Sequence, residues 1–298
     1  MKKAANAVTN TPGAATCAWR PAWVTHRTVD HASITPGGSG APPAAGTKPR
    51  FVRRPVPWPR WHIHLPMSVR RISVGGTGCW QTSSMVQAPT DPFEGVDQPW
   101  RSAFLLAWEA FQTRSIPVGS VLVNAAGEVV RSGRNRSNDR TGPVGHVAGS
   151  YIAHAEINTL ATLPQGDYND HTLYTTLEPC FLCTAALRHS HVGVVRFAAP
   201  DPMWRGIERL PELNDQMARR WTRREGPLDG HLQTWAALLP LVSSVERGVQ
   251  SVQQQHAATM PEVLSLAREW AGARADRLRA LDLDSAMMQA WPMLTSGR

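Results

Sequence analysis

Residues 171–183 decide the fold, and they read His171-Thr-Leu-Tyr-Thr-Thr-Leu-Glu-Pro179-Cys180-Phe-Leu-Cys183. The first seven residues predict a strand over His171–Leu177, and the pattern from the proline onward predicts a helix over Pro179–Ser190. A Pro-Cys-x-x-Cys motif is expected by chance only about 0.004 times in a chain with this many prolines and cysteines. The motif is therefore a specific signal, although alone it also fits a redox pair or half of a structural zinc site.

The segments around this stretch alternate between helical and extended patterns. Phe104, Leu105, Trp108 and Phe111 recur at three- and four-residue steps, which predicts an amphipathic helix. This alternation predicts an α/β layer rather than separate modules. The expected elements are a helix over Trp100–Gln112, strands over Val118–Val123 and Glu128–Arg131, a polar loop over Asn135–Gly149, a helix over Ala153–Leu163 and a strand over Val192–Ala198.

The predicted topology brings the triplet His154-Ala155-Glu156 to the same edge of the sheet as the two cysteines. A helix that begins near His154 leads away from this edge, the strand over 171–177 returns to it, and the next helix begins there. One imidazole and the sulfurs of Cys180 and Cys183 can then converge as metal ligands, which leaves a fourth tetrahedral position for water, as in a catalytic zinc site. The positive ends of both helices favour thiolates. Glu156 points away from the metal and is free to move protons.

Four stretches lie in the same order as in one known family: Pro117-Val-Gly-Ser-Val-Leu-Val123, Gly133-Arg-Asn135, His154-Ala-Glu-Ile157, and Leu173 to Cys183 continuing to Phe197. With them the chain resembles the zinc-dependent cytidine/deoxycytidylate deaminase superfamily, whose signature is His-x-Glu followed by Pro-Cys-x-x-Cys. The resemblance is greatest to the branch of nucleobase and tRNA-adenosine deaminases. It covers residues 98–200, about a third of the chain.

The resemblance implies a three-layer α/β/α cytidine-deaminase-like fold with a mixed sheet. It also implies a hydrolase that acts on non-peptide C–N bonds in cyclic amidines, with Zn²⁺ held by His154, Cys180 and Cys183. Zinc-bound hydroxide would attack the ring carbon that carries the amino group, with release of ammonia, and Glu156 would carry the protons.

Two further residues match the family pattern for substrate contacts. Asn135 matches the substrate-contacting asparagine, with a turn residue of positive φ as the alternative. The backbone amide of Ala155 would bind the base. Family members are commonly homodimers or larger, so a homodimer is expected. Glu178 is interpreted as a charge at a helix N-terminus. The ligand set is complete without further histidines, so the remaining candidates are interpreted as surface or loop residues: His146, His189 and His191.

The motif predicts the reaction and leaves the substrate open. A free nucleobase or nucleoside is the first hypothesis, and a tRNA-specific adenosine deaminase is the alternative. Two features argue against tRNA: residues 85–298 carry 20 arginines and 22 acids, a net charge of −2, and the loop between Asn135 and His154 is longer than in compact tRNA-adenosine deaminases. The clusters Arg131-x-x-Arg134-x-Arg136 and Arg219-Arg220-x-x-Arg223-Arg224 leave the tRNA alternative open, although the second cluster is better interpreted as a charged helix face. A non-catalytic, zinc-stabilised interaction module is the third hypothesis.

The net charge of +8 is unevenly distributed along the 298 residues. Residues 1–84 hold 11 basic residues and 1 acidic residue, whereas residues 85–298 hold 20 arginines, no lysine and 22 acids. The first segment is therefore predicted to be a low-complexity, disordered basic leader. Its stretch Arg50–Arg71 is a candidate for binding polyanions, and His62-x-His64 has metal-like spacing without further ligands.

The remaining organisation is a zinc deaminase domain over residues 85–210 and a helical C-terminal extension over residues 211–298. In the extension, the apolar steps from Val263 to Leu281 predict one helix after Pro261. Four cysteines exclude a disulfide-built scaffold, and neither a signal peptide nor a membrane-spanning run is recognised. A cytoplasmic protein is expected.

Overall fold

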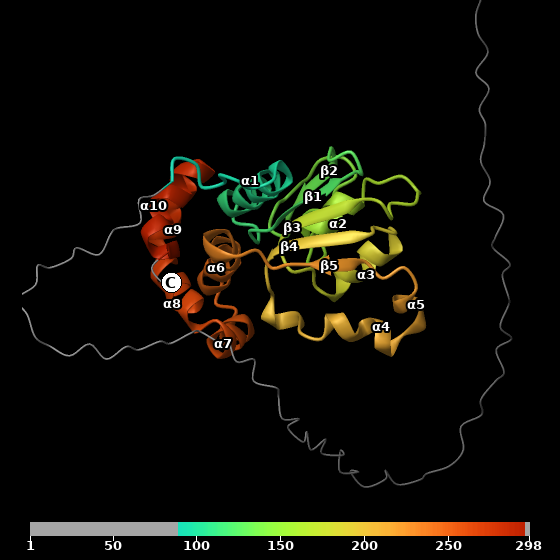
Figure 1. The fold of residues 1–298 in the computed structure, drawn as a ribbon. Helices are drawn as coiled ribbons and strands as arrows, with labels where there is room; N and C mark the ends of the chain where they lie inside the picture. Colours follow the sequence, from blue (N-terminus) through green and yellow to red (C-terminus); the bar gives the residue numbers. More distant parts are fainter. Residues whose placement is uncertain (1–88, 296–298) are drawn as a thin grey trace, which may run out of the picture. The chain divides into compact units, whose positions relative to one another are not determined.

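The fold was analysed in a computed structural model, in which residues 89–295 are described (Figure 1). The leader predicted over residues 1–84, with its stretch Arg50–Arg71 and the His62-x-His64 pair, lies outside these residues. Within residues 89–295 we find no helix with the length and apolar character needed to cross a membrane.

A mixed sheet of five strands lies at the centre of the described region, in the order β2-β1-β3-β4-β5. The β1 strand pairs antiparallel with β2 and β3, whereas β3 with β4 and β4 with β5 are parallel. Four of the strands confirm the predictions to within a few residues. The short, fully charged β5 was not predicted, because its residues lie in a polar, arginine-rich segment. The strands are β1 (Gly119–Val123), β2 (Val129–Arg134), β3 (Thr172–Leu177), β4 (Val194–Ala199) and β5 (Arg223–Glu225).

Helices cover both faces of this sheet, which confirms the three-layer α/β/α arrangement. On one face α1 (Gln98–Gln112) packs against β1 and β3, and α6 (Gly230–Glu246) packs against β4. On the other face α2 (Ala155–Leu160) packs against β1 and β2, and α3 (Phe181–His189) contributes Leu187 to the same apolar cluster. Successive side chains of each strand point to opposite faces of the sheet, and both faces are covered by helices.

The first helix, α1, is held close to β1. It buries Phe104, Trp108 and Phe111, as predicted, but the prediction that Leu105 belongs to the apolar face was wrong, because this side chain is 44% exposed. A side chain at Gly119 of β1 would collide with the backbone of α1. Only glycine permits this close approach of helix and strand.

The chain beyond β4 is mainly helical, as predicted. The predicted single helix from Pro261 to Leu281 is wrong in one respect: it is interrupted at Gly272, whose φ of +79° lies outside the helical region. The elements are η1 (Pro202–Trp204), η2 (Ile207–Arg209), α4 (Leu210–Leu213), α5 (Asp215–Ala218), α7 (Gln250–Thr259), α8 (Pro261–Trp270), α9 (Ala273–Arg279) and α10 (Leu283–Thr295).

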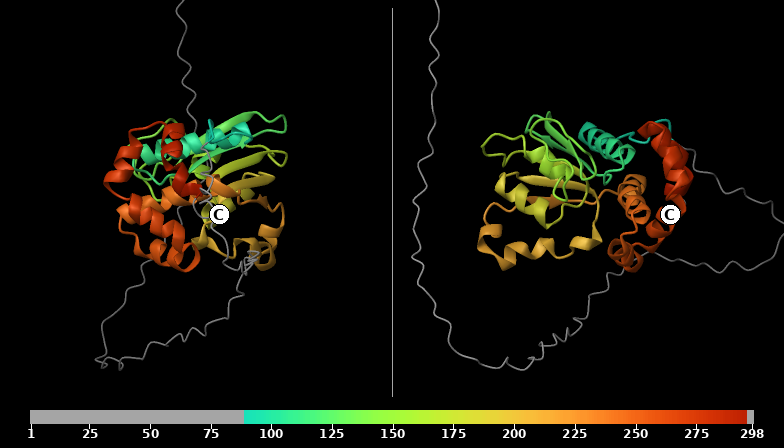
Figure 2. Two further views of the ribbon diagram at one scale, coloured as in Figure 1. Left: turned by 60° about the vertical axis from the view of Figure 1, so that its left-hand side comes forward. Right: turned by 180° about the vertical axis from the view of Figure 1, so that it is seen from behind.

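The C-terminal helices share an apolar core with α1 and one face of the sheet. Trp235 of α6 stacks on Trp108 of α1, with ring centroids 5.7 Å apart, and meets Trp270 of α8 edge-on at 6.0 Å. Figure 2 shows from two further directions that α8, α9 and α10 lie beside α6 and α1. The helices α8 and α10 therefore pack on the outer side of α6 and α1, which themselves cover this face of the sheet.

Candidate metal centre and active site

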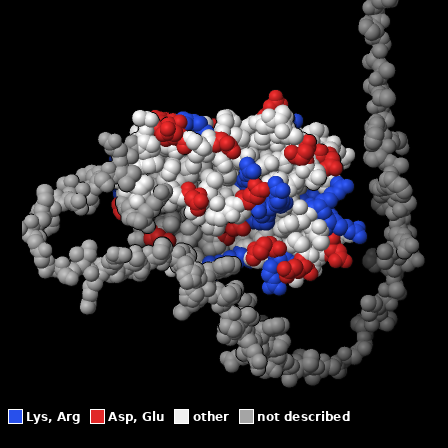
Figure 3. All heavy atoms as spheres, viewed as in Figure 1, with Lys and Arg blue, Asp and Glu red and all other residues white. Residues whose placement is uncertain are grey.

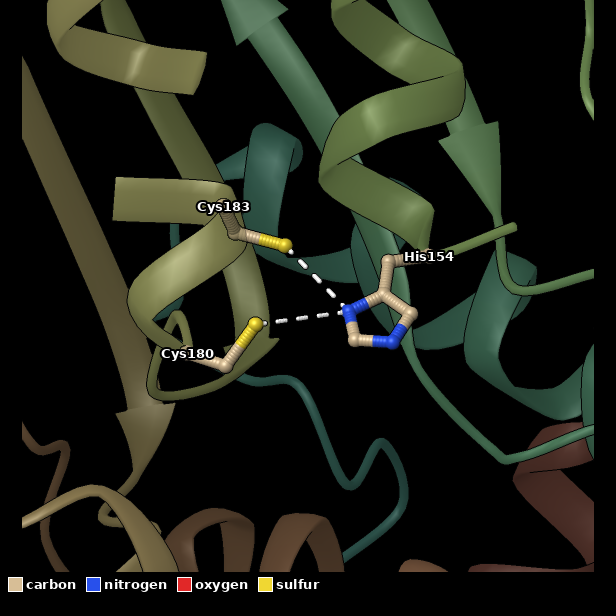
Figure 4. A group of neighbouring side chains, drawn as sticks. All are labelled: His154, Cys180 and Cys183. Atoms are coloured by element: carbon tan, nitrogen blue, oxygen red, sulfur yellow. Dashed lines mark hydrogen bonds between the residues drawn. The ribbon is translucent and has the colours of Figure 1, made fainter. Parts of the chain in front are cut away.

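Three metal-ligand side chains meet where α2 and α3 begin. His154 is the N-cap of α2, Cys180 is the N-cap of α3, and Cys183 lies in the first turn of α3. Figure 4 shows the three side chains pointing toward one another from these two helix ends. The Nδ1 atom of His154 lies 3.5 Å from the Sγ of Cys180 and 3.3 Å from that of Cys183. The convergence predicted from the topology is therefore present.

The spacing of the donor atoms fits zinc. Tetrahedral Zn²⁺ with Zn–S bonds of about 2.3 Å and Zn–N bonds of about 2.0–2.1 Å requires about 3.6 Å between a ligating nitrogen and sulfur. The observed nitrogen–sulfur distances are 3.5 and 3.3 Å, and one imidazole with two thiols is a donor set that zinc prefers. Across residues 89–295, no second group of three or more potential ligands was found. His154, Cys180 and Cys183 are thus placed to bind a metal ion.

The electrostatics of the three donors are strongly coupled. The hydrogen bond with the Cys183 thiol is the largest cause that lowers the pKa of Cys180 to about 4. The same hydrogen bond, followed by burial, raises the pKa of Cys183 well above its ordinary value. The hydrogen bond with Cys180 is the main cause that raises the pKa of His154. Cys180 therefore has thiolate character, which metal binding requires.

Glu156 lies beside the three donors and has two identified partners. Its side chain is buried, with 4% of the residue exposed. Oε1 accepts a hydrogen bond from the Thr175 hydroxyl of β3 at 2.9 Å, and Oε2 accepts one from the Cys183 thiol at 3.3 Å. Burial is the largest cause that raises the pKa of Glu156. Thr175 was not predicted from the sequence, because nothing but the β3 register brings it to this carboxylate.

A cavity of about 320 Å³ opens onto this group. Its lining includes His154, Cys180 and Glu156, together with Asn135 and Ala155, the two residues predicted to contact substrate. Cys183 is fully buried behind the cavity wall. All six predicted site residues therefore lie in one place.

Asn135 and Ala155 each present an unpartnered donor at this wall. The Asn135 side-chain oxygen accepts from the Ser137 amide at 2.9 Å, and its Nδ2 has no hydrogen-bond partner among the described residues. Asn135 is not among the residues with positive φ, so the alternative interpretation of it as a left-handed turn residue is wrong. Ala155 is the first residue of α2, where a backbone N–H has no partner within the helix. Both groups are available to a ligand.

The opposite wall of the cavity comes from the C-terminal helices. It contains residues of η1, α6 and α7, none of which belongs to a recognisable motif, so sequence reasoning missed them. These residues are Met203 and Trp204 of η1, Ala237, Pro240, Leu241, Ser243 and Ser244 of α6, Arg247 and Val249 of the α6–α7 connection, and Val252 and His256 of α7.

Two carboxylates, Glu178 and Asp201, line the cavity near the cysteines. Glu178 lies just before Pro179 and forms a salt bridge with Arg224 of β5, with Nη2 and Oε1 2.7 Å apart. Its other oxygen accepts a hydrogen bond from the Asp201 amide at 3.1 Å. Burial is the largest cause that raises the pKa of Asp201 to about 6. Sequence reasoning missed the roles of Arg224 and Asp201, because Arg224 depends on the pairing of β4 with β5 and Asp201 on the pairing of β3 with β4.

The comparisons with known proteins agree on one family of zinc-binding deaminases. Residues 97–199 match the cytidine and deoxycytidylate deaminase zinc-binding region. The chain is 37% identical over 105 residues to a tRNA-specific adenosine deaminase of Haemophilus influenzae, covering 34% of this chain and 56% of that protein. It is 30% identical over 100 residues to a tRNA-specific adenosine deaminase of Rickettsia felis, covering 33% of this chain and 67% of that protein.

Among solved structures, the guanine deaminase of Nitrosomonas europaea is similar with 21% identity and a TM-score of 0.38, covering 49% of this chain and 83% of that chain. The chain covers between 21% and 56% of the length of three curated relatives that it matches.

Proposed function

Because the chain belongs to the family with the cytidine and deoxycytidylate deaminase zinc-binding region, we propose that it is a zinc-dependent hydrolytic deaminase of a nucleobase or nucleoside. In this reaction the exocyclic amino group of the ring is replaced by oxygen and leaves as ammonia. His154, Cys180 and Cys183 would hold the ion. When bound, zinc polarises water and lowers its pKa toward about 7.

Glu156 is the proposed proton carrier. A general acid–base needs a titratable group within hydrogen-bond reach of the reacting atoms and a pKa suited to exchanging protons near neutrality. Glu156 lines the cavity two residues after a ligand, and burial raises its pKa from its ordinary value. The Thr175 hydroxyl holds one of its oxygens, so the carboxyl has a defined orientation. Glu156 would take a proton from water and return it to the ring and the leaving amine.

Asn135 and Ala155 are the proposed substrate contacts. The Asn135 Nδ2 and the Ala155 amide have no hydrogen-bond partner among residues 89–295, and both residues line the cavity. Donors that line a cavity without a partner are available to a ligand. An acceptor atom of the base would bind each of them, which would orient the ring toward the metal and Glu156.

The size and lining of the cavity carry the proposal of a small substrate. Helices α6 and α7 form its far wall, and its volume of about 320 Å³ is near the lower end of the range for small-molecule sites, about 300–1,000 Å³. This space suits a base with a sugar better than a folded RNA. Most of the lining is apolar, which suits the faces of an aromatic ring.

A tRNA-specific adenosine deaminase is the second candidate, and the curated relatives favour it. Basic side chains gather over β5 and beside α5 on the face shown in Figure 3. The two arginines of β5 are already paired, Arg223 with Glu225 and Arg224 with Glu178. The described basic surface therefore supports RNA binding less than the arginine count suggests.

The test is ammonia release by the zinc-loaded full-length chain. Adenine, guanine, cytosine, their nucleosides, the 5′-monophosphates of these nucleosides and an anticodon-stem RNA are each offered as substrate. Release from a base, a nucleoside or a monophosphate, and not from the RNA, is expected. Release from the RNA alone would favour the second candidate, and zinc binding without release from any substrate would favour a non-catalytic module.

The proposed homodimer is tested separately. Light scattering of the purified, zinc-loaded chain during size-exclusion chromatography is expected to give twice the mass of one chain. A mass of 32.7 kDa would contradict the homodimer and leave the proposed reaction unaffected.

A further inference from the structure

The end of α6 presents a stripe of side chains to the cavity. Ala237, Pro240, Ser244 and Arg247 follow one another at three- and four-residue steps and all line the cavity, as residues on one face of a helix do. The stripe begins with apolar residues, continues with serine, and ends with an exposed arginine. The wall opposite Asn135 therefore becomes polar toward solvent.

Ser243 places an unpartnered hydroxyl at the cavity. The residue is 5% exposed and lines the cavity, and its Oγ makes no hydrogen bond with the described residues. The neighbouring Ser244 differs, since its hydroxyl donates to the Val249 carbonyl at 3.4 Å. A hydroxyl offers one donor and two acceptor lone pairs, so this group keeps its full hydrogen-bonding capacity for a ligand. A ligand in the cavity would supply the missing partner.

His256 of α7 carries a second unpartnered atom. The residue is 7% exposed and lines the same cavity. Its Nδ1 donates to the Val252 carbonyl at 2.8 Å, because a carbonyl can only accept. In the neutral ring Nε2 is then an acceptor, and it makes no hydrogen bond within residues 89–295. Ser243 and His256 together offer one donor and one acceptor, the combination that binds a hydroxyl group.

Arg247 supplies a positive charge at the solvent end of the stripe. It is the one lysine or arginine that lines the cavity, it is exposed, and no described residue forms an ion pair or hydrogen bond with its guanidinium. The adjacent Glu246, in contrast, is bound by Arg279. The α7 helix begins just beyond, at Gln250, and its N-cap residue Val249 also lines the cavity and provides no side-chain cap. An exposed arginine next to a helix N-terminus suits a phosphate that stays partly hydrated.

We propose that Ser243, His256 and Arg247 form a sugar-phosphate subsite, so that the substrate is a nucleoside monophosphate. The base would lie toward His154 and Glu156, a sugar hydroxyl between Ser243 and His256, and the phosphate at Arg247. This subsite lies outside residues 97–199, the segment that matches the deaminase family. The proposal rests on the proposed function for the identity of the base, and it is tested by binding rather than turnover.

The experiment uses the zinc-loaded full-length chain with Glu156→Gln, so that ligands bind without being consumed. Calorimetry compares adenosine, guanosine and cytidine with their 5′-monophosphates. One monophosphate is expected to bind at least about tenfold more tightly than its nucleoside, as a charge-assisted hydrogen bond to phosphate provides. Adding Arg247→Ala removes this preference and changes nucleoside affinity by less than about twofold.

Arg268→Ala is the matched control. Arg268 is an exposed arginine of α8 that lies outside the cavity lining and forms no ion pair with described residues. Its substitution removes the same charge and is expected to leave the preference unchanged. Loss of the preference in this variant would mean that net charge, rather than the subsite, attracts phosphate, and it would overturn the proposal.

Three further results would overturn the subsite. These are equal affinity for every nucleoside and its monophosphate, binding of no monophosphate, and an equal loss of affinity for both ligands with Arg247→Ala. Failure of the proposed function is distinguishable from these results. A preference for monophosphate that depends on Arg247, in a protein that releases ammonia from no substrate, would support the subsite and contradict the deaminase.

Discussion

Replacing Arg224 by alanine should destabilise the fold more than any change at an exposed arginine. Arg224 lies on β5 with its side chain 11% exposed, and its Nη2 is 2.7 Å from Oε1 of Glu178, which is 18% exposed. Its Nη1 also donates to the Thr184 hydroxyl at 3.2 Å. Without this guanidinium, the Glu178 carboxylate beside Pro179 would be left with one hydrogen bond, from the Asp201 amide.

The expected loss follows from this burial. Removing one partner of a buried ion pair costs about 3–5 kcal/mol, and the residual exposure of Arg224 and Glu178 places the expected loss at about 3 kcal/mol of unfolding free energy. For a region of this size, such a loss lowers the Tm by about 6–12 °C. Arg223→Ala is the matched control, because Arg223 is the adjacent residue of β5 but is 69% exposed. Arg223→Ala should lower the free energy of unfolding by no more than about 1 kcal/mol.

Urea unfolding of the zinc-loaded proteins at pH 7.5 measures both losses. Glu178→Gln and the double variant complete a thermodynamic cycle, which separates the ion pair from the packing of Arg224 over the Phe197 ring. A coupling free energy of about 2 kcal/mol is expected. The reasoning is refuted if Arg224→Ala costs no more than Arg223→Ala, or if the coupling is close to zero.

Three further predictions concern the cavity and the leader. Thr175→Val removes the hydroxyl that orients Glu156 and should lower kcat by about tenfold with KM and zinc content unchanged; an unchanged kcat in steady-state assays would contradict this orienting role. Burial raises the pKa of Asp201 from 3.8 to about 6. Ionisation of this group therefore lowers the free energy of unfolding progressively between about pH 4 and pH 6, and the free energy stays at the lower value above pH 6. Asp201→Asn should therefore be more stable than the original chain at pH 7.5, by up to about 3 kcal/mol in chelator-containing urea titrations, and a difference that does not grow between pH 4.5 and pH 7.5 would contradict the assigned cause. Deletion of residues 1–84 should leave zinc content and the unfolding transition unchanged, and loss of the folded protein would contradict their assignment as a leader.

The metal group was predictable because its signals are local. Pro179, Cys180 and Cys183 lie in one motif, and a simple topological rule brought His154 to the same edge. Four strands and the helices near this motif were predictable from apolar periodicity for the same reason. The exposure of Leu105 was not, since a three- and four-residue pattern does not define how wide the covered face of a helix is.

The far wall of the cavity was not predictable, since it depends on contacts between residues distant in sequence. Ser243 and His256 have no motif, and they reach the site only because α6 packs on β4 and α7 packs on η1. Arg224 seemed part of a basic surface cluster until β5 paired with β4 and brought it to Glu178. The division of the chain at residue 210 stays a prediction, and β5, beyond that position, belongs to the central sheet.

The most direct test of the account compares the zinc-loaded chain with its Glu156→Gln variant. Ammonia release is measured with the substrate that the panel identifies, and zinc is measured by elemental analysis of the same samples. The account predicts about one zinc per chain in both proteins and a loss of ammonia release of at least about 100-fold in the variant. A variant that retains both its zinc and its turnover would contradict the central claim that Glu156 carries the protons of a zinc-dependent deamination.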